Sequence, residues 1–268
     1  MKKIMETFTI NDFFNEQNEI TNINEEAYHH IEDIRETIDS CTRTSDECFY
    51  IIDYHKRNFL HVSDNPTYFG GLSAEKIKEM GYKFYLHFVP EEEIKMLIDI
   101  NHVSLSYFNQ LPNNEKPHYF ISYNIHIKNR NHKILVNHRL TPLKLYNGKI
   151  WLALCSISPA TNKVVGKVYL HRQKSLDTIY YSLQNKSWEK FSFARLNDIE
   201  KRIFLYSIQG LSIKETAEKV CRSEIAVKKT RSKLLEMLNA NNFQEAIHLA
   251  LLYTLIPQHY YKIFFLST

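Results

Sequence analysis

A strict alternation of apolar and polar residues after Pro117 constrains the fold of this 268-residue chain more than any other feature. The apolar positions of this alternation are Tyr119, Ile121, Tyr123, Ile125 and Ile127. Successive side chains of a β-strand point to opposite faces, so a period of two predicts a strand with one buried face. A second strand is expected over residues 133–143. Asn147-Gly148 is typical of the type I′ turn that would lead into a third, over 150–158. This segment predicts an antiparallel sheet whose last strand is central, because residues 151–155 are apolar on both faces.

Two more strands and several helices are predicted before this sheet. Residues 48–54 and 58–63 are rich in aromatic and β-branched residues, as strands are, and residues 24–38 predict one helix. Ser73 precedes a short helical segment. A longer helix is expected to begin at Pro90, which three glutamates follow. The residues that this helix turns inward are expected to be Ile94, Leu97, Ile98, Leu105 and Phe108.

The net charge of the chain lies in one helix-sized segment. The whole chain carries +4 at pH 7, and residues 222–233 contain five basic residues and one acidic residue, which is also +4. The rest of the chain therefore sums to zero. Such a concentration of positive charge is the electrostatic footprint of a protein that binds a polyanion, although a run of charge can also be a solvated face.

Short helices with clear start signals surround this basic segment. Asn197 and Ser212 are each followed by a glutamate three residues later, which is the pattern of a capping box. Gly210 suits the left-handed position that ends a helix, and Ser223 is expected to cap a third helix. The apolar stripe of this third helix is Val227, Leu234 and Leu238. A fourth helix is expected over residues 242–252.

Three stretches within residues 196–230 read LNDIEKRIF, GLSIKETA and SEIAVKKT. They resemble the LuxR/GerE-type helix-turn-helix family over about 60 residues. The positions that keep the family's pattern are Glu200, Gly210, Glu215, Ala217, Ser223, Val227 and Lys228. The chain departs from it at Ile199, Ala226 and Thr230, where the family has Arg, Thr and His. We expect the first two departures to remove polar contacts inside the domain and Thr230 to lie on the DNA-facing side.

The resemblance implies a helix that enters the major groove of double-stranded DNA. The residues that it places near phosphates or bases are Lys214, Ser223, Lys228, Lys229, Arg231, Ser232 and Lys233.

The order of two strands, short helices, one long helix and three antiparallel strands resembles that of PAS sensor domains, here over residues 46–158. This implies a domain that dimerises or binds a small molecule. A phosphoacceptor receiver would alternate five strands with five helices, and that order is absent from the sequence. The combined layout is similar to that of PAS–LuxR regulators of Bacteroidetes.

The sequence gives little sign of cofactor or metal chemistry. His102 lies on the inward stripe of the long helix, in the region from which haem-binding PAS domains ligate their cofactor. A histidine packed in the core is the more frequent role for such a position. Four cysteines without CxxC spacing and thirteen histidines without paired spacing predict no metal site. The chain has no Gly-rich phosphate loop or nucleophile elbow, so we expect no cofactor and no enzyme.

We therefore expect an α+β protein in which a PAS-like antiparallel sheet with flanking helices precedes an all-α, four-helix domain. The expected divisions are a helical segment (1–45), the PAS-like domain (46–158), a β-rich connector (159–193), the helix-turn-helix domain (194–252) and an apolar tail (253–268). The tail is expected to pack on another domain or a dimer partner, because it is too apolar to stay in water.

Two functions from different classes fit this organisation. The first is a cytoplasmic, homodimeric transcription regulator that binds double-stranded DNA, does not contact a membrane and takes a small-molecule ligand in its PAS-like domain. The second is a sensor or scaffold that uses a degenerate helix-turn-helix to bind another protein. Salt-dependent retention on DNA or heparin would separate them.

Overall fold

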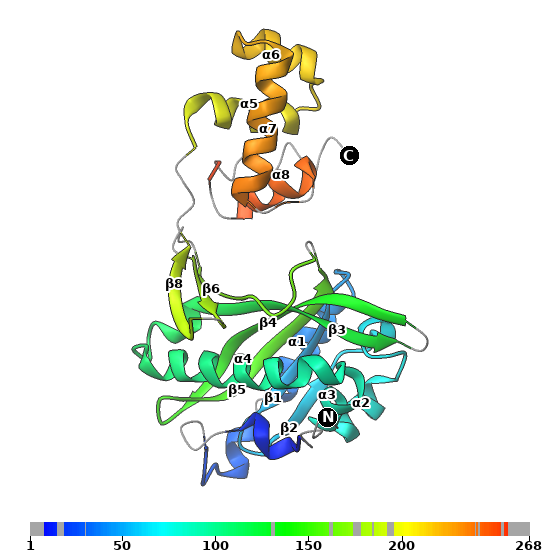
Figure 1. Cartoon of the computed structure of the whole chain (residues 1–268). Coiled ribbons are helices and arrows are strands. Elements are labelled where there is room, and N and C mark those ends of the chain that lie inside the picture. Colours follow the sequence, from blue (N-terminus) through cyan, green and yellow to red (C-terminus); the bar gives the residue numbers. More distant parts are fainter. Residues whose placement is uncertain are drawn as a thin grey trace, which may run out of the picture. The chain divides into compact units, whose positions relative to one another are not determined.

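The protein consists of two compact units, which we call the sheet unit (residues 1–173 and 179–189) and the helical unit (174–178 and 190–268). The computed structural model describes residues 8–14, 19–29, 31–129, 132–160, 163–173, 178–183, 185–191, 196–238, 240, 242–252 and 255–256. Figure 1 shows both units. The expected α+β fold is confirmed, with a large antiparallel sheet followed by four helices.

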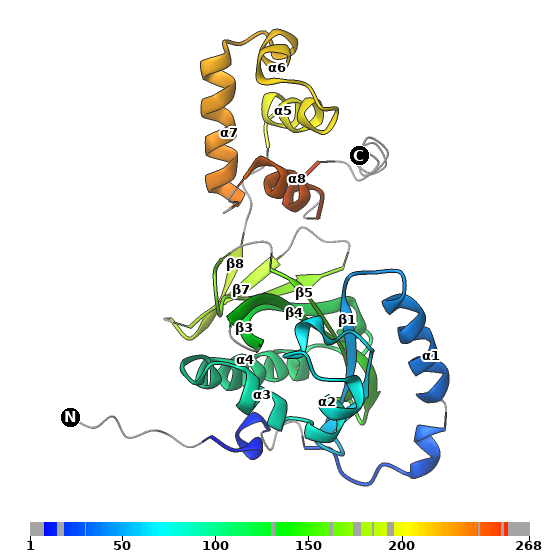
Figure 2. The same ribbon diagram turned by 90° about the vertical axis from the view of Figure 1, so that its right-hand side faces the viewer.

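One eight-stranded sheet dominates the sheet unit, in the order β2-β1-β5-β4-β3-β6-β7-β8. Its strands are β1 (Cys48–Asp53), β2 (Asn58–Val62), β3 (Tyr119–Asn129), β4 (His132–Tyr146), β5 (Lys149–Pro159), β6 (Val168–Arg172), β7 (Thr178–Ser182) and β8 (Ser187–Phe191). The helices of this unit are α1 (Ile31–Thr42), α2 (Ala74–Met80), α3 (Lys83–Phe88) and α4 (Glu91–Gln110), with short 3-10 turns that include η3 (Glu25–Tyr28). Figures 1 and 2 together show α1 on one side of the sheet and α4 on the other.

The strands predicted from the alternation after Pro117 are present. Asn147 and Gly148 both have positive φ, at 48° and 78°, as a type I′ turn requires. The turn joins β4 to β5, and β5 lies between β1 and β4, with which it pairs antiparallel. This central position explains why Trp151, Leu152 and Ala153 are all buried.

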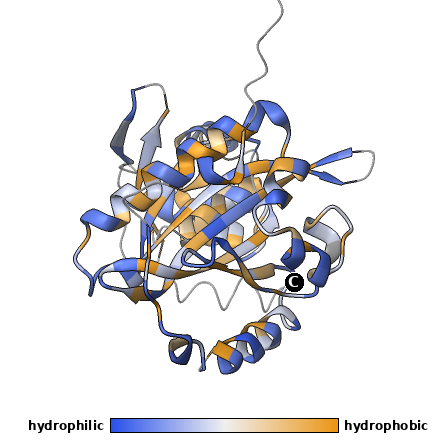
Figure 3. Cartoon of the chain, turned by 90° about the horizontal axis from the view of Figure 1, so that it is seen from below, coloured by the Kyte–Doolittle hydropathy of each residue, from blue (hydrophilic) through white to orange (hydrophobic). Residues whose placement is uncertain are grey.

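The core of the sheet unit lies between the sheet and α2–α4. All five residues expected to face inward from α4 are buried, and Ser73 caps α2 by accepting a hydrogen bond from the Lys76 amide. Figure 3 shows hydrophobic segments gathered in the middle of this unit, with hydrophilic segments at its periphery.

The structure differs from the sequence predictions near the amino terminus. The single helix expected over residues 24–38 is instead the turn η3 followed by α1, which continues to Thr42. Asn24 caps η3 by accepting from the Glu26 amide. The last turns of α1 gain hydrogen bonds from Thr37, Ser40 and Thr42 to carbonyl oxygens four residues earlier. These local contacts fix the start of η3 and accompany the last turns of α1.

The residues predicted as a connector, 159–193, continue the sheet. β6 pairs antiparallel with β3, and β7 and β8 follow it outward. This pairing brings His171 of β6 beside the buried Ser122 of β3, whose Oγ lies 2.8 Å from Nε2 of His171. Most of the apolar tail, residues 257–268, lies outside the described residues. Among the residues described, no helix is long and apolar enough to cross a membrane.

The helical unit contains α5 (Asp198–Ile208), α6 (Ile213–Val220), α7 (Glu224–Leu238) and α8 (Phe243–Leu252), which confirms the four expected helices. Its core is built from one face of each helix. The buried residues of the core include Ile203, Phe204, Ile208, Ala217, Val220, Val227, Leu234, Leu238, Ala246, Ile247 and Ala250. Figure 2 shows α7 beside α5 and α6.

Candidate nucleic-acid interface

Both predicted capping boxes in the helical unit are formed. The Asn197 side chain accepts from the Glu200 amide, and the Glu200 carboxylate accepts from the Asn197 amide, each at 2.9 Å. Ser212 and Glu215 repeat this exchange at the start of α6, at 3.3 and 2.8 Å. These pairs satisfy amide groups that would otherwise lack partners, so they fix where α5 and α6 begin.

The turns between the helices use left-handed residues. Gly210 has φ of +80°, and its amide donates to the Ser207 carbonyl while the Leu211 amide donates to the Tyr206 carbonyl. This is the Schellman arrangement at the end of α5. Cys221, with φ of +54°, ends α6 in a left-handed conformation.

Ser223 caps α7, because its Oγ accepts from the Ala226 amide at 3.2 Å. A tight turn therefore joins α6 to α7, as in a helix-turn-helix.

Helix α7 has two distinct faces. Val227, Leu234 and Leu238 are buried against the other helices. The exposed Glu236 lies on the opposite side, near the end of the helix. On the same side, nearer its start, lie four exposed residues at positions i, i+3, i+4 and i+7, which is the spacing of a single helical face. We call them the outer face of α7: Ile225, Lys228, Lys229 and Ser232.

Three of the seven residues predicted to contact DNA lie on this outer face, namely Lys228, Lys229 and Ser232. Within the described part of the chain, the ammonium groups of Lys228 and Lys229 form no ion pair or hydrogen bond. Two others, Lys214 and Ser223, line a shallow surface depression between α6 and the start of α7. The structure thus brings these five residues to neighbouring surfaces of α6 and α7.

The remaining two predicted residues contact the unit itself. The guanidinium of Arg231 lies 3.8 Å from the centre of the Phe243 ring on α8, and burial lowers its pKa. The ammonium of Lys233 lies 2.9 Å from the carboxylate of Glu200 on α5. Both basic groups therefore have partners that link α7 to its neighbours.

The three departures from the family pattern are neighbours in space. Ile199, Ala226 and Thr230 line one groove of about 230 Å³ between α5 and α7. Thr230 was expected on the DNA-facing side, and that expectation stays a prediction. It is half-buried, and its hydroxyl donates to the Ala226 carbonyl at 2.9 Å.

Sequence reasoning missed Ile225, whose side chain is 78% exposed at the start of α7. Its helical spacing with Lys228, Lys229 and Ser232 was the signal that could have found it.

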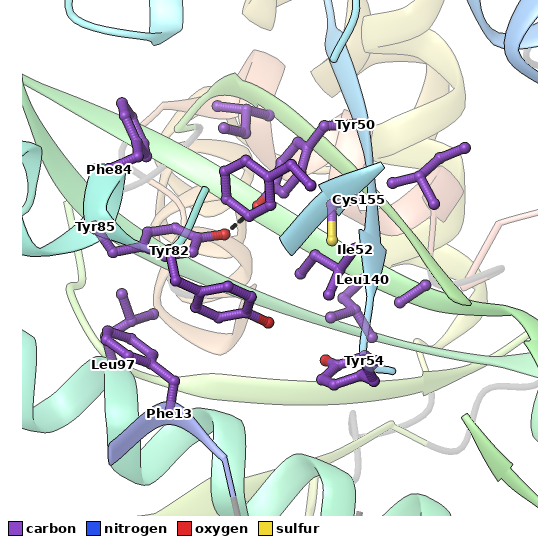
Figure 4. Packing of buried hydrophobic residues seen from close by; sticks show 14 of the residues in the cluster. Phe13, Tyr50, Ile52, Tyr54, Tyr82, Phe84, Tyr85, Leu97, Leu140 and Cys155 are labelled. Carbon is purple, nitrogen blue, oxygen red and sulfur yellow. Dashed lines mark hydrogen bonds between the residues drawn. The ribbon is translucent and has the colours of Figure 1, made fainter. Parts of the chain in front are cut away.

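The sheet unit contains a second feature of functional interest, a buried polar cluster of Tyr50, Tyr54, Tyr82, Tyr85 and His138. The Tyr50 hydroxyl bonds with the Tyr85 hydroxyl and with Nε2 of His138. Burial lowers the pKa of His138 to about 3, so the imidazole is neutral at physiological pH. Figure 4 shows the tyrosines of the cluster and the bond between Tyr50 and Tyr85.

Three polar atoms of this cluster have no hydrogen-bond partner among the described residues: Oη of Tyr54, Oη of Tyr82 and Nδ1 of His138. Burial raises the pKa of Tyr54, and the nearby Tyr82 hydroxyl opposes this shift in part. The two hydroxyls are thus neighbours, but within the described part of the chain neither one meets a partner at hydrogen-bonding geometry. Orphaned buried groups of this kind are rare in folded proteins and mark this part of the core as unusual.

His102, the haem candidate, is half-buried on α4, and its Nε2 also lacks a hydrogen-bond partner in the part of the chain that the structure describes. Among the described residues, no group of three or more His, Cys, Asp and Glu side chains is placed to hold a metal ion.

No protein-family model matches the chain, and no curated protein matches it. Solved structures with some similarity include a VqmA–ligand–DNA complex from Vibrio cholerae (14% identity, TM-score 0.33, covering 86% of this chain and 91% of that one). A Vibrio cholerae VqmA dimer described among LuxR-type receptors shows 14% identity and a TM-score of 0.32, covering 89% and 92%. A phage VqmA–DPO complex shows 12% identity and a TM-score of 0.31, covering 88% and 93%. At this level of similarity the likeness does not transfer a function to this chain.

Proposed function

We propose that this chain is a DNA-binding transcription regulator whose α7 enters the major groove of double-stranded DNA. The observation that carries this proposal is the outer face of α7, where Lys228 and Lys229 are exposed and unpaired among the described residues. At ~1.5 Å per residue, a helix of this length extends roughly 20 Å, enough to lie in a groove with basic groups reaching the phosphates.

The geometry suggests different roles for the basic residues. Lys228 and Lys229 would neutralise phosphates on the two sides of the groove, and Lys214 would reach the backbone from α6. Ser223 would act by fixing the start of α7, because its Oγ already caps the helix. Arg231 and Lys233 would position α7 through Phe243 and Glu200.

The proposal is tested by measuring affinity for duplex DNA across a range of salt concentrations. Lys228→Ala and Lys229→Ala should each lower affinity for specific and random duplexes alike. Each should also reduce the slope of log K against log salt by about 0.9 for a lost phosphate contact. Lys201→Ala is the matched control, because Lys201 lies on α5 and faces Asp198 of its own helix at 3.9 Å. Binding and salt slopes that match the wild type in both α7 variants would contradict the proposal.

We further propose that the sheet unit controls this activity by dimerising or by binding a small polar molecule. A dimer would present two copies of α7 to paired half-sites, as helix-turn-helix proteins commonly do. The orphaned polar atoms of Tyr54, Tyr82 and His138 support a small polar ligand, because such a molecule would satisfy them. Native mass spectrometry of the purified chain tests both ideas, through the number of copies and any additional non-protein mass.

A further inference from the structure

One apolar side chain stands apart from the rest of the helical unit. Ile225 is 78% exposed, whereas the next most exposed large apolar residues among those described, Leu183 and Val164, reach 39% and 38%. We propose that Ile225 is a specificity-determining residue that reads the C5-methyl group of a thymine in the major groove. This inference rests on the proposed function.

The position of Ile225 suits contact with a base. It is the second residue of α7, and the first residues of a recognition helix are those that reach base edges. Lys228 and Lys229 follow one turn later on the same face. One turn is roughly 5 Å along the axis, so Ile225 would face a base pair about one or two steps from those next to the lysines.

The stability of the helix does not explain an isoleucine here. Its β-branched side chain is a poorer helix former than alanine, and its exposure leaves it little packing against the unit. Val227, two residues later, supplies the buried contact of this turn.

The surroundings of Ile225 favour DNA over a protein partner. A protein that covered Ile225 would also have to desolvate the ammonium groups of Lys228 and Lys229, whereas DNA offers them phosphates. The thymine methyl group is the apolar group that the major-groove edge presents, and aliphatic side chains contact it. The apolar side chain and the two ammonium groups on the outer face of α7 therefore both fit duplex DNA.

The test removes the thymine methyl group and the Ile225 side chain, first separately and then together. A preferred site is first selected with the wild-type chain from a pool of random duplexes, and each thymine in it is then replaced by uracil, which lacks only the methyl group. At one or two positions, uracil should lower wild-type affinity about fourfold, the effect of one buried methyl-sized group. Ile225→Ala should show no uracil effect at those positions, and Leu183→Ala should keep the wild-type response.

Each other outcome has a definite meaning. Uracil sensitivity that is equal in the wild type and in Ile225→Ala would overturn the role of Ile225 while leaving DNA binding intact. Absence of salt-dependent binding by the wild-type chain would overturn this inference and the proposed function together. A changed sedimentation coefficient in Ile225→Ala, without any loss of uracil sensitivity, would make Ile225 a contact between copies of the chain. The thermal midpoint of Ile225→Ala should equal or slightly exceed that of the wild type, so a folding defect would not obscure the result.

Discussion

The ammonium of Lys233 lies 2.9 Å from the carboxylate of Glu200, whose side chain is only 7% exposed. The other oxygen of the same carboxylate accepts from the Asn197 amide at 2.9 Å. One buried group therefore completes the cap of α5 and also ties α5 to α7. The position of α7 within the helical unit depends on this shared carboxylate.

Lys233→Ala should destabilise the helical unit without changing its contacts with DNA. The pair is largely exposed on the lysine side, so we expect a loss on the order of 1 kcal/mol in the free energy of unfolding. The salt slope of DNA binding should stay that of the wild type. Lys229→Ala should behave in the opposite way, with unchanged stability and a reduced slope. Urea unfolding and filter binding on both variants measure this, and a reduced slope for Lys233→Ala would place Lys233 at the phosphates.

The two left-handed turns predict opposite effects of substitution. Gly210→Ala should destabilise the helical unit by about 1 kcal/mol, because alanine is strained at φ of +80°. No atom of the described residues lies within 4 Å of the added Cβ, so a steric clash with them would not contribute. Cys221→Gly should stabilise it by roughly 0.5–1 kcal/mol, because a non-glycine residue occupies the left-handed region there. Calorimetric midpoints check both signs, and a stabilising Gly210→Ala would refute the backbone argument.

The sequence predicted the helical unit well because its signals are local. Capping boxes, a left-handed glycine and an apolar stripe all act within one or two turns, so the limits of α5 to α8 follow from neighbouring residues. The sequence could not show which basic residues face outward. The partners of Arg231 and Lys233 lie on α8 and α5, far along the chain. Likewise, only the fold shows that Ile199, Ala226 and Thr230 line one groove. The three departures from the family pattern therefore lie at one place in the helical unit.

The sheet unit shows the same division between local and distant information. The hairpin at Asn147-Gly148 and the apolar strand β5 were predictable from turn chemistry and composition. The pairing of β6 with β3 was not, because strand propensity does not say which edge a later strand will join. The buried polar cluster was also hidden, since Tyr50, Tyr85 and His138 come from three separate elements.

Acid should destabilise the sheet unit through its buried histidines. Burial, and to a lesser extent Arg139, lowers the pKa of His171 to about 3 from the ordinary value of 6.5, and burial does the same to His138. Between these values the unfolded chain takes up protons that the folded chain does not, so the free energy of unfolding falls as the pH falls from about 6.5 towards 3.

His171→Gln tests this in urea titrations at pH 6 and pH 5. Glutamine can reach the Ser122 hydroxyl that Nε2 of His171 meets at 2.8 Å, but it does not titrate. As the pH falls from 6 to 5, the free energy of unfolding should fall less for His171→Gln than for the wild type. The difference should be about 1 kcal/mol per pH unit. Identical slopes for the two proteins would show that His171 is accessible to protons in the folded state.

The buried polar cluster gives a prediction whose sign bears on ligand binding. Tyr82→Phe removes a hydroxyl that has no hydrogen-bond partner among the residues described, so it should leave stability unchanged or raise it by up to ~1 kcal/mol. Tyr85→Phe removes the same atom type from a similarly buried ring, but it breaks the bond to Tyr50 and should cost ~1 kcal/mol. Denaturant unfolding measures the stability of both variants and of the wild type. Each measurement is repeated after exhaustive dialysis under denaturing conditions and refolding, so that the contribution of a bound small molecule is separated from that of the protein. If the chain purifies with a small polar molecule held by Tyr82, then Tyr82→Phe will be less stable than the wild type before this treatment and no less stable after it. A loss of stability in Tyr82→Phe that persists after refolding would mean that the hydroxyl has a partner within the protein.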